Sequence, residues 1–171
     1  MIRTKWVDRT FNLNIPPGWL PNILSRLDGL SMRLEKITSV LSDEQISLRL
    51  NEAWSIKEHI GHLIDLEELH TGRIHDFIER KPILRAADMS NKKTHAANHN
   101  TQSIEALHLE FKGKRDHFIS SLQALDDETQ KFIAVHPRLN VSMRVVDMAF
   151  FTAEHDDHHM ASIYKILESF K

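Results

Sequence analysis

The sequence has 171 residues and no cysteine; 41% of the residues are hydrophobic, 27% are charged, and the formal net charge is −2. A chain of this length can form one domain with a substantial core, and this composition excludes wholesale disorder and fibrous repeats. The balanced charge, without a basic block, argues against nucleic acid as a partner, because phosphate binding needs clustered Lys and Arg.

The first predicted element is an N-terminal arm, residues 1–19. It lacks the apolar stretch of a signal peptide, and no run of the chain approaches the roughly 20 apolar residues of a membrane span. We therefore expect a soluble cytoplasmic protein that does not associate with a membrane. The prolines and glycine at 16–18 disfavour a helix, so we expect the arm to pack on the domain by its aromatic side chains, Trp6, Phe11 and Trp19.

Two long helices are predicted next. Apolar residues recur every three or four positions from about residue 19 to residue 41, which is the period of a helix facing a core. Residues 42–45 are a polar turn or one short helical turn. Ser55 and Glu58 then have the spacing of a capping box, in which each side chain satisfies a backbone amide of the first turn. The second helix starts there, and Pro82 ends it near Arg80.

The rest of the chain predicts two more long helices. Residues 83–101 lack a strong period and are interpreted as a loop, and a connection of this length is usually functional or mobile and could cover a pocket. A third helix runs from about 101 or 103 to Leu125. Residues 126–141 are turn-rich, and irregular structure is favoured there over a brief strand. Ser142 is predicted to cap the fourth helix, from about Met143 to Ser169.

This pattern predicts a fold class. Four long helices, without an alternating strand pattern or an internal repeat, indicate an all-α protein, a four-helix bundle with one long crossover connection and an N-terminal arm. We expect residues 1–171 to form a single domain.

The fourth helix carries two histidines on its inward face. His155 and His159 are one turn apart, about 6 Å along the axis, close enough to share one ion. A buried imidazole needs a hydrogen-bond partner, a charge or a metal. Chance would give roughly one such pair among 12 histidines, and the chain holds two, the second being His95 and His99. The spacing therefore leaves open core histidines that bond to carboxylates such as Glu154, Asp156 or Glu67.

A metal site on this pair needs a further ligand from another helix, since two imidazoles leave an ion short of protein ligands. Without cysteine, that ligand must be His, Asp or Glu. The second helix carries His59, His62 and His70. Periodicity places both His59 and His62 at or near the apolar stripe and does not separate them.

Two segments carry a resemblance to a known family. The run Trp54-Ser-Ile-Lys-Glu-His-Ile-Gly-His-Leu-Ile-Asp-Leu-Glu67, together with Ala153-Glu-His-Asp-Asp-His-His-Met-Ala161, resembles the DinB-like metalloprotein superfamily. In that family a four-helix bundle holds a divalent ion with one histidine of the second helix and two of the last. The resemblance implies His62, His155 and His159 as metal ligands. It extends over most of the chain, including the arm, the crossover and the turn at residues 136–138. His59, His70 and His158 stand outside the motif, and His158 is expected at the surface or behind the ligands.

Three neutral imidazoles leave coordination positions open to water or substrate, which is typical of a catalytic site. Zinc or nickel suits such ligands best, with iron or manganese as alternatives. The resemblance implies a metal-dependent hydrolase, or an S-transferase or isomerase that uses a low-molecular-weight thiol with a small-molecule substrate. Further catalytic residues are not assigned. Candidates are Glu58 or Asp65 as a general base, Asp65, Glu67, Asp156 or Asp157 as orienting partners, and Arg73 or Arg144 as anion contacts.

A competing interpretation is a non-catalytic protein, in which the bundle and any bound metal are structural. The aromatic residues of the arm would then serve a homodimer interface, and a homodimer is the assembly we expect because it is the commonest. A third interpretation is a family member that has kept its ligands and lost its activity.

Overall fold

The computed structural model describes residues 3–51 and 53–170; residues 1–2 of the predicted arm, residue 52 and residue 171 lie outside the described residues. The four long helices of the described chain are α1 (Leu20–Thr38), α3 (Ile56–Ile78), α5 (Ile104–Gln123) and α7 (Val145–Glu168). The predicted all-α four-helix bundle is therefore confirmed. None of the helices in the described ranges is long and apolar enough to cross a membrane.

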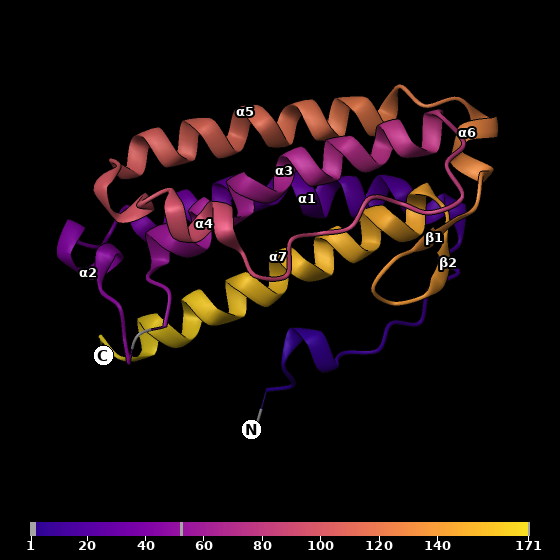
Figure 1. Cartoon of the computed structure of the whole chain (residues 1–171). Coiled ribbons are helices and arrows are strands. Elements are labelled where there is room, and N and C mark those ends of the chain that lie inside the picture. Colours follow the sequence, from indigo (N-terminus) through magenta and orange to yellow (C-terminus); the bar gives the residue numbers. More distant parts are fainter. Residues whose placement is uncertain (1–2, 52, 171) are drawn as a thin grey trace.

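The long crossover determines how the helices are directed. It returns the chain to the end of the bundle where α3 begins, so that α5 runs parallel to α3, while α1 and α7 run the other way (Figure 1). α1 and α3 each pack against both α5 and α7. α1 therefore lies diagonally opposite α3, and α3 shares a direct interface with α7, the helix that carries His155 and His159.

The core consists of two apolar clusters. One surrounds residues such as Phe77, Phe118 and Met148, and the other surrounds Ile60 and Phe111. On three of the four long helices, buried polar side chains lie between the residues of one apolar cluster and those of the other. They are Glu67 and His70 of α3, Arg115 of α5, and His155, Asp156 and His159 of α7. The bundle thus contains a polar layer between two apolar regions.

Arg115 holds this layer together. Its guanidinium donates to Glu67 Oε1 at 2.8 Å, to Asp156 Oδ2 at 2.5 Å and to the carbonyl oxygen of Leu27 at 3.4 Å, so it links all four long helices. Burial lowers the pKa of Arg115, but Asp156 and Glu67 outweigh burial and leave it above its ordinary value. Burial also raises the pKa of Glu67 to about 7. Removing the arginine would leave two buried acids without their cation.

Two capping boxes fix the starts of helices. Ser55 Oγ accepts from the amide of Glu58 at 3.1 Å, and Glu58 Oε2 accepts from the amide of Ser55 at 2.9 Å, as predicted for α3. Ser42 and Gln45 form the same arrangement ahead of α2 (Asp43–Ser47), at the predicted short helical turn.

Residues 126–141 correct two predictions. Instead of irregular structure they form α6 (Asp127–Lys131) and β1 (Ala134–His136), which pairs antiparallel with β2 (Val141–Met143). The turn closes through Asn140, whose φ of 52° lies in the left-handed region that asparagine tolerates. Because Ser142 pairs with Val135 in this hairpin, it does not cap α7. Asp147 does so instead, its Oδ2 accepting from the amide of Arg144 at 3.0 Å.

The crossover is more regular than the predicted loop. It contains α4 (Lys92–Ala96) and the 3₁₀ turn η3 (His99–Thr101), so His95 and His99 lie in short helical segments. Residues Asn91 and Asn98, which directly precede these segments, have positive φ of 52° and 50°. In Figure 1 the crossover runs back along the bundle, and its segments α4 and η3 pack on α3.

The arm packs on the domain as predicted, at α7, through Trp6 and Phe11 but not through Trp19. It includes the 3₁₀ turns η1 (Trp6–Asp8) and η2 (Pro17–Trp19). The ring centroids of Trp6 and Phe11 lie 5.1 and 5.0 Å from that of Phe151, whereas Trp19 is 54% exposed. Asp147 Oδ1 also accepts from the amides of Asn14 and Ile15, at 2.8 and 2.7 Å, which joins the arm to the first turn of α7.

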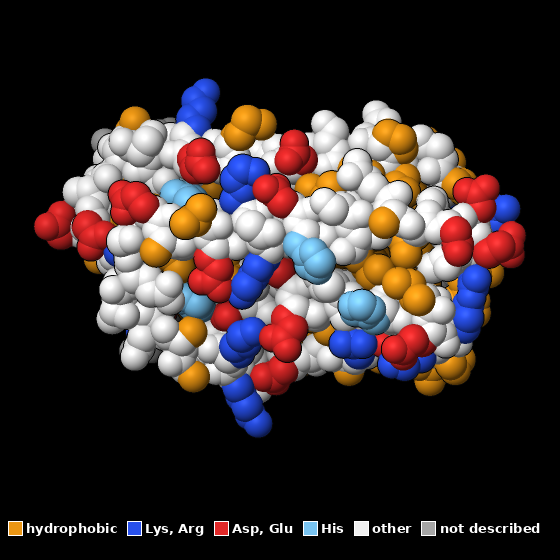
Figure 2. Space-filling view, turned by 90° about the horizontal axis from the view of Figure 1, so that it is seen from above, with side chains coloured by type: hydrophobic (Ala, Val, Ile, Leu, Met, Phe, Trp, Pro, Cys, Tyr) orange, Lys and Arg blue, Asp and Glu red, His pale blue; other side chains and the backbone are white. Residues whose placement is uncertain are grey.

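The surface carries mixed charge on the side of α5. Lys112 pairs with Asp116 and Lys114 with Glu110, each four residues apart on this helix. The face shown in Figure 2 accordingly has acidic and basic side chains side by side rather than one continuous basic region. The absence of a nucleic-acid partner stays a prediction.

Candidate metal centre

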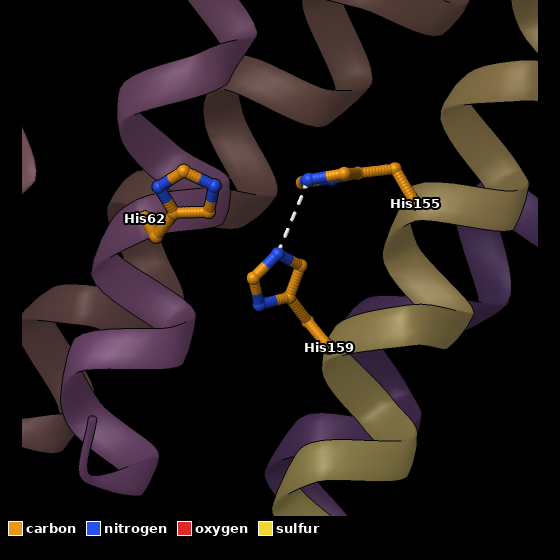
Figure 3. Close-up of side chains that lie close together, drawn as sticks. All are labelled: His62, His155 and His159. Atoms are coloured by element: carbon orange, nitrogen blue, oxygen red, sulfur yellow. Dashed lines mark hydrogen bonds between the residues drawn. The ribbon is translucent and has the colours of Figure 1, made fainter. Parts of the chain in front are cut away.

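Three histidines from two helices converge inside the bundle. His62 projects from α3 and His155 and His159 from α7, and one ring nitrogen of each lies within 4.8 Å of the other two (Figure 3). The Nε2 atoms of His155 and His159 are 3.2 Å apart. Two imidazole nitrogens bound to one tetrahedral ion at 2.0–2.1 Å are separated by roughly 3.3 Å. The spacing of His155 and His159 therefore fits a shared divalent ion, and His62 lies close enough to be a third ligand.

The protonation state also suits metal binding. Burial lowers the pKa of His62 to about 4, although Asp65 opposes this, and burial holds the pKa of His155 and His159 well below the usual value. The three rings are thus neutral near pH 7, which is the form that binds metals. In the described chain no carboxylate is hydrogen-bonded to His155 or His159, and Nδ1 of His155 is buried without a partner. The alternative of core histidines bonded to Glu154, Asp156 or Glu67 is not what the structure has.

A short chain of hydrogen bonds orients His62. Its Nδ1 lies 3.0 Å from Thr94 Oγ1, and this hydroxyl donates to Asp65 Oδ2 at 2.9 Å. The same oxygen accepts from His99 Nε2 at 2.9 Å. Burial raises the pKa of Asp65, but the bonds from His99 and Thr94 outweigh burial and leave it below its ordinary value. Asp65 therefore stays ionised and acts on His62 through Thr94, a residue of the crossover that the sequence did not single out.

His59 is the partner of His159. Their Nδ1 atoms are 2.9 Å apart. If Nε2 of His159 binds an ion, its Nδ1 carries the hydrogen and donates to His59, which leaves the lone pair of Nε2 aimed at the cluster. Periodicity placed His59 and His62 on the same stripe, and the structure shows both side chains pointing inward. His62 therefore belongs to the cluster, whereas His59, about one turn earlier on α3, lies behind the cluster and contacts His159.

Several acids and one arginine singled out in the sequence have other roles. Glu58 pairs with Arg49 in addition to its capping role, and Asp157 pairs with Arg26 and Arg33. Glu67 and Asp156 pair with Arg115. Arg144 donates to Asp147 and to the carbonyl oxygen of Ile15. These residues support helix ends and helix packing, and in the described chain none of them is hydrogen-bonded to the three histidines.

A cavity of about 430 Å³ opens beside the cluster. This volume lies within the roughly 300–1,000 Å³ of small-molecule sites. Trp54 covers one side, with its ring 4.7 Å from that of His62, and Trp6 covers another, 4.9 Å from His155. Residues 86–89 and 91 of the crossover complete the wall, which places the crossover over a pocket as expected. His158, half-buried and bonded to Arg3, and the buried His70 also line it.

The chain is similar to known proteins both in its sequence and in its fold. The family model of the DinB superfamily matches residues 26–163. Among solved structures, YfiT from Bacillus subtilis, described as a probable metal-dependent hydrolase with an unusual four-helix bundle topology, superposes with a TM-score of 0.79 at 16% identity, covering 95% of this chain and 93% of its own.

A mycothiol-dependent maleylpyruvate isomerase is also similar in fold, with a TM-score of 0.66 at 10% identity. The match covers 86% of this chain but 60% of the isomerase, so this chain spans less than two thirds of that protein. At these identities the likeness concerns the fold. No curated protein matches the sequence.

Proposed function

The chain belongs to the DinB superfamily, and from this premise we propose that it is a divalent-metal-dependent enzyme whose ion is held by His62, His155 and His159. The observation that carries the proposal is the convergence of their three nitrogens within 4.8 Å at the wall of a cavity. Zinc or nickel suits three neutral imidazoles best, and iron or manganese also uses such ligands.

The ion would supply Lewis acidity, lowering the pKa of a water or a thiol that enters the open position. The protein would hold the ligands and limit access. His59 and Thr94 orient two of the three rings, and Trp54 and Trp6 shield the cluster on two sides. A small-molecule substrate would enter the cavity between them.

The first candidate reaction is the transfer of a low-molecular-weight thiol, held as its thiolate, to an electrophilic substrate. Hydrolysis at such a site usually needs a general base. Asp88 is the only carboxylate among the described residues that line the cavity, and it is exposed and already accepts from Ser90 and Lys92. A thiol needs less help because coordination to a metal is sufficient to deprotonate it. The isomerase of similar fold is mycothiol-dependent, which supports the same choice.

Hydrolysis is the second candidate, supported by the description of YfiT as a probable metal-dependent hydrolase. A non-catalytic, dimerising bundle is favoured less, because most of the aromatic residues proposed for a homodimer interface pack against other residues of the same chain. Trp6 and Phe11 pack within the chain, and Trp19 is the exposed aromatic of the arm.

Elemental analysis of the purified protein tests the metal site. We expect one divalent ion per chain in the wild type and in His117→Ala, which removes an exposed imidazole of α5. His159→Ala should lose at least 10-fold in metal affinity, because removing a residue that merely orients a ligand already costs about 10- to 100-fold. Equal metal content in His159→Ala and the control would exclude the proposed ligand set.

Activity assays then separate the two reactions. Small thiols such as cysteine and cysteamine would be offered with 1-chloro-2,4-dinitrobenzene, and 4-nitrophenyl acetate would be offered without thiol. Thiol-dependent turnover that disappears in His159→Ala supports transfer. Thiol-independent ester cleavage with the same dependence on His159 supports hydrolysis.

A further inference from the structure

Two hydrogen-bond donors on one wall of the cavity have no partner in the protein. Both belong to the hairpin of β1 and β2, His136 as the last residue of β1 and Arg138 in the turn: in the described structure Nε2 of His136 and Nη2 of Arg138 are buried without a hydrogen-bond partner. The amide of Leu139 donates to Nδ1 of His136 at 3.2 Å, so the hydrogen of this ring lies on Nε2. Its pKa is lowered to about 3, by burial first and then by Arg73 and Arg138, so the ring is neutral. His136 therefore presents an N–H donor to the cavity.

Arg73 of α3 adds a second guanidinium to the same wall. It is 2% exposed, and its Nε donates to the carbonyl oxygen of Arg85 at 3.2 Å. Among residues 3–51 and 53–170, neither Arg73 nor Arg138 forms a salt bridge, while the oxygens of Asp76 are already bonded to Arg85 and Lys81. Arg138 is half-buried, and its Nη1 donates to the carbonyl oxygen of Val7 at 3.5 Å. Two guanidinium groups that line one cavity without a paired acid repel each other, and an anion would offset that cost.

Aromatic rings join this wall to the histidine cluster. The guanidinium of Arg138 lies 6.0 Å from the ring centroids of both Trp6 and Phe151. Trp6 also contacts His155, with ring centroids 4.9 Å apart. The three donors and the three histidines line the same cavity, and Trp6 contacts both groups.

We propose that Arg73, Arg138 and His136 form a subsite for an oxyanion, the carboxylate or phosphate of a small substrate whose reacting part lies at the three histidines. A planar guanidinium matches either group with paired hydrogen bonds. Leu66, Leu69 and Met89 line the cavity between, which suits an acid with an apolar body. The placement of the reacting part rests on the proposed function, whereas the anion subsite itself does not need the metal.

A matched pair of ligands and a matched pair of variants test this subsite. Benzoate, phenyl phosphate and the neutral benzamide would be titrated into wild-type protein, in zinc-loaded and metal-free form, and followed by NMR. Arg138→Gln removes the proposed contact. Arg9→Gln removes the same charge beside Trp6, with its guanidinium 5.8 Å from that ring, but Arg9 does not line the cavity.

We expect wild type and Arg9→Gln to bind benzoate or phenyl phosphate at least 10-fold more tightly than benzamide, with or without zinc. Arg138→Gln should lose about 10-fold or more of that affinity, the usual effect of a hydrogen bond to a charged group. Arg138→Lys keeps the positive charge but cannot form the paired hydrogen bonds of a guanidinium. A loss of anion affinity between those of wild type and Arg138→Gln would exclude misfolding as the cause. The stronger of the two anions identifies the substrate's acid group.

Three results would overturn the subsite: equal binding of benzoate, phenyl phosphate and benzamide, equal losses in Arg138→Gln and Arg9→Gln, or anion binding that vanishes with the metal. Zinc content measured on the same samples keeps the two proposals apart. Normal zinc content without anion preference removes only the subsite, and anion preference without zinc binding removes only the metal centre.

Discussion

Each of the three clustered histidines has a second ring nitrogen, and the surroundings of that atom differ. Nδ1 of His62 meets Thr94, Nδ1 of His159 meets His59, and Nδ1 of His155 has no partner in the described chain. A metal-bound imidazole is usually held by a bond from its other nitrogen. Two rings are therefore oriented by hydrogen bonds, and His155 depends on its packing against Trp6.

The link from Asp65 to His62 gives a prediction at this scale. Asp65→Asn weakens the acceptor that Thr94 uses, so the orientation of His62 is held less firmly. We expect a 10- to 100-fold loss of zinc affinity, measured by competition with a coloured chelator. Glu68→Gln is the control, because it removes an exposed carboxylate of the same helix that pairs with Lys93. Equal zinc affinities in the two variants would contradict the orienting role of Asp65.

The sequence predicted part of this site. Spacing placed His155 and His159 on one face, the family resemblance selected His62, and Asp65, within one turn of His62, was a candidate orienting partner. Thr94 was out of reach because it lies in a segment without a period. Periodicity also says which face a side chain takes but not which partner it finds, so Glu67 and Asp156 were candidates for the histidines although Arg115 binds both.

At the scale of elements, α3 is the surface on which the crossover lies. Two glycines of α3 allow this approach: a Cβ on Gly61 would lie 2.1 Å from Cγ of His99, and one on Gly72 would lie 2.1 Å from Nη1 of Arg85. Arg85 bonds Asp76 and His99 bonds Asp65, so both contacts join the crossover to carboxylates of α3. The docking of His99 on α3, and with it the bond from His99 to Asp65, thus depends on the absence of a side chain at Gly61, whereas the flexible side chain of Arg85 can shift.

Replacing one of these glycines should separate packing from helix propensity. Gly61→Ala would push the His99 ring out of place, and we expect a loss of about 1–3 kcal/mol in the free energy of unfolding, the range for overpacking. Gly113→Ala of α5 has nothing within 4 Å of the added Cβ. It should stabilise by up to about 1 kcal/mol through helix propensity. Urea denaturation of both variants measures this, and a stabilised Gly61→Ala would contradict the docking of His99.

Both ends of α3 were predictable because a capping box and a proline mark them locally, whereas the start of α7 was misplaced at Ser142. The hairpin and the short helices of the crossover were not predictable. β1 and β2 have three residues each, too few to show an alternating pattern. The helical segments of the crossover follow left-handed backbone at Asn91 and Asn98, a local conformation that apolar spacing does not report.

For the whole molecule, the polar layer between two apolar clusters makes stability depend on protonation. Burial lowers the pKa of His59 and His62 to about 4 and that of His136 to about 3. Between about pH 6.5 and pH 4 the unfolded chain therefore binds protons that the folded chain does not, and stability falls as the pH falls. Glu67 acts in the opposite direction, because its raised pKa makes the folded chain bind a proton between about pH 7 and pH 4.5. Because three histidines with lowered pKa oppose this one acid, the net effect is a loss of stability as the pH falls.

The metal-free protein should consequently lose on the order of several kcal/mol of unfolding free energy between about pH 7 and pH 5, by urea denaturation. Zinc at roughly 1,000 times its dissociation constant should add about 4 kcal/mol near pH 7, because it binds the folded chain. Near pH 5 most of this addition should remain, because burial keeps the pKa of His62 at about 4 and that of His155 and His159 well below the usual value, so protons do not yet compete for these nitrogens. His159→Ala should show the acid loss but little stabilisation by zinc. A zinc effect of equal size in wild type and His159→Ala, or one that is already lost near pH 6, would place the ion somewhere other than on these three rings.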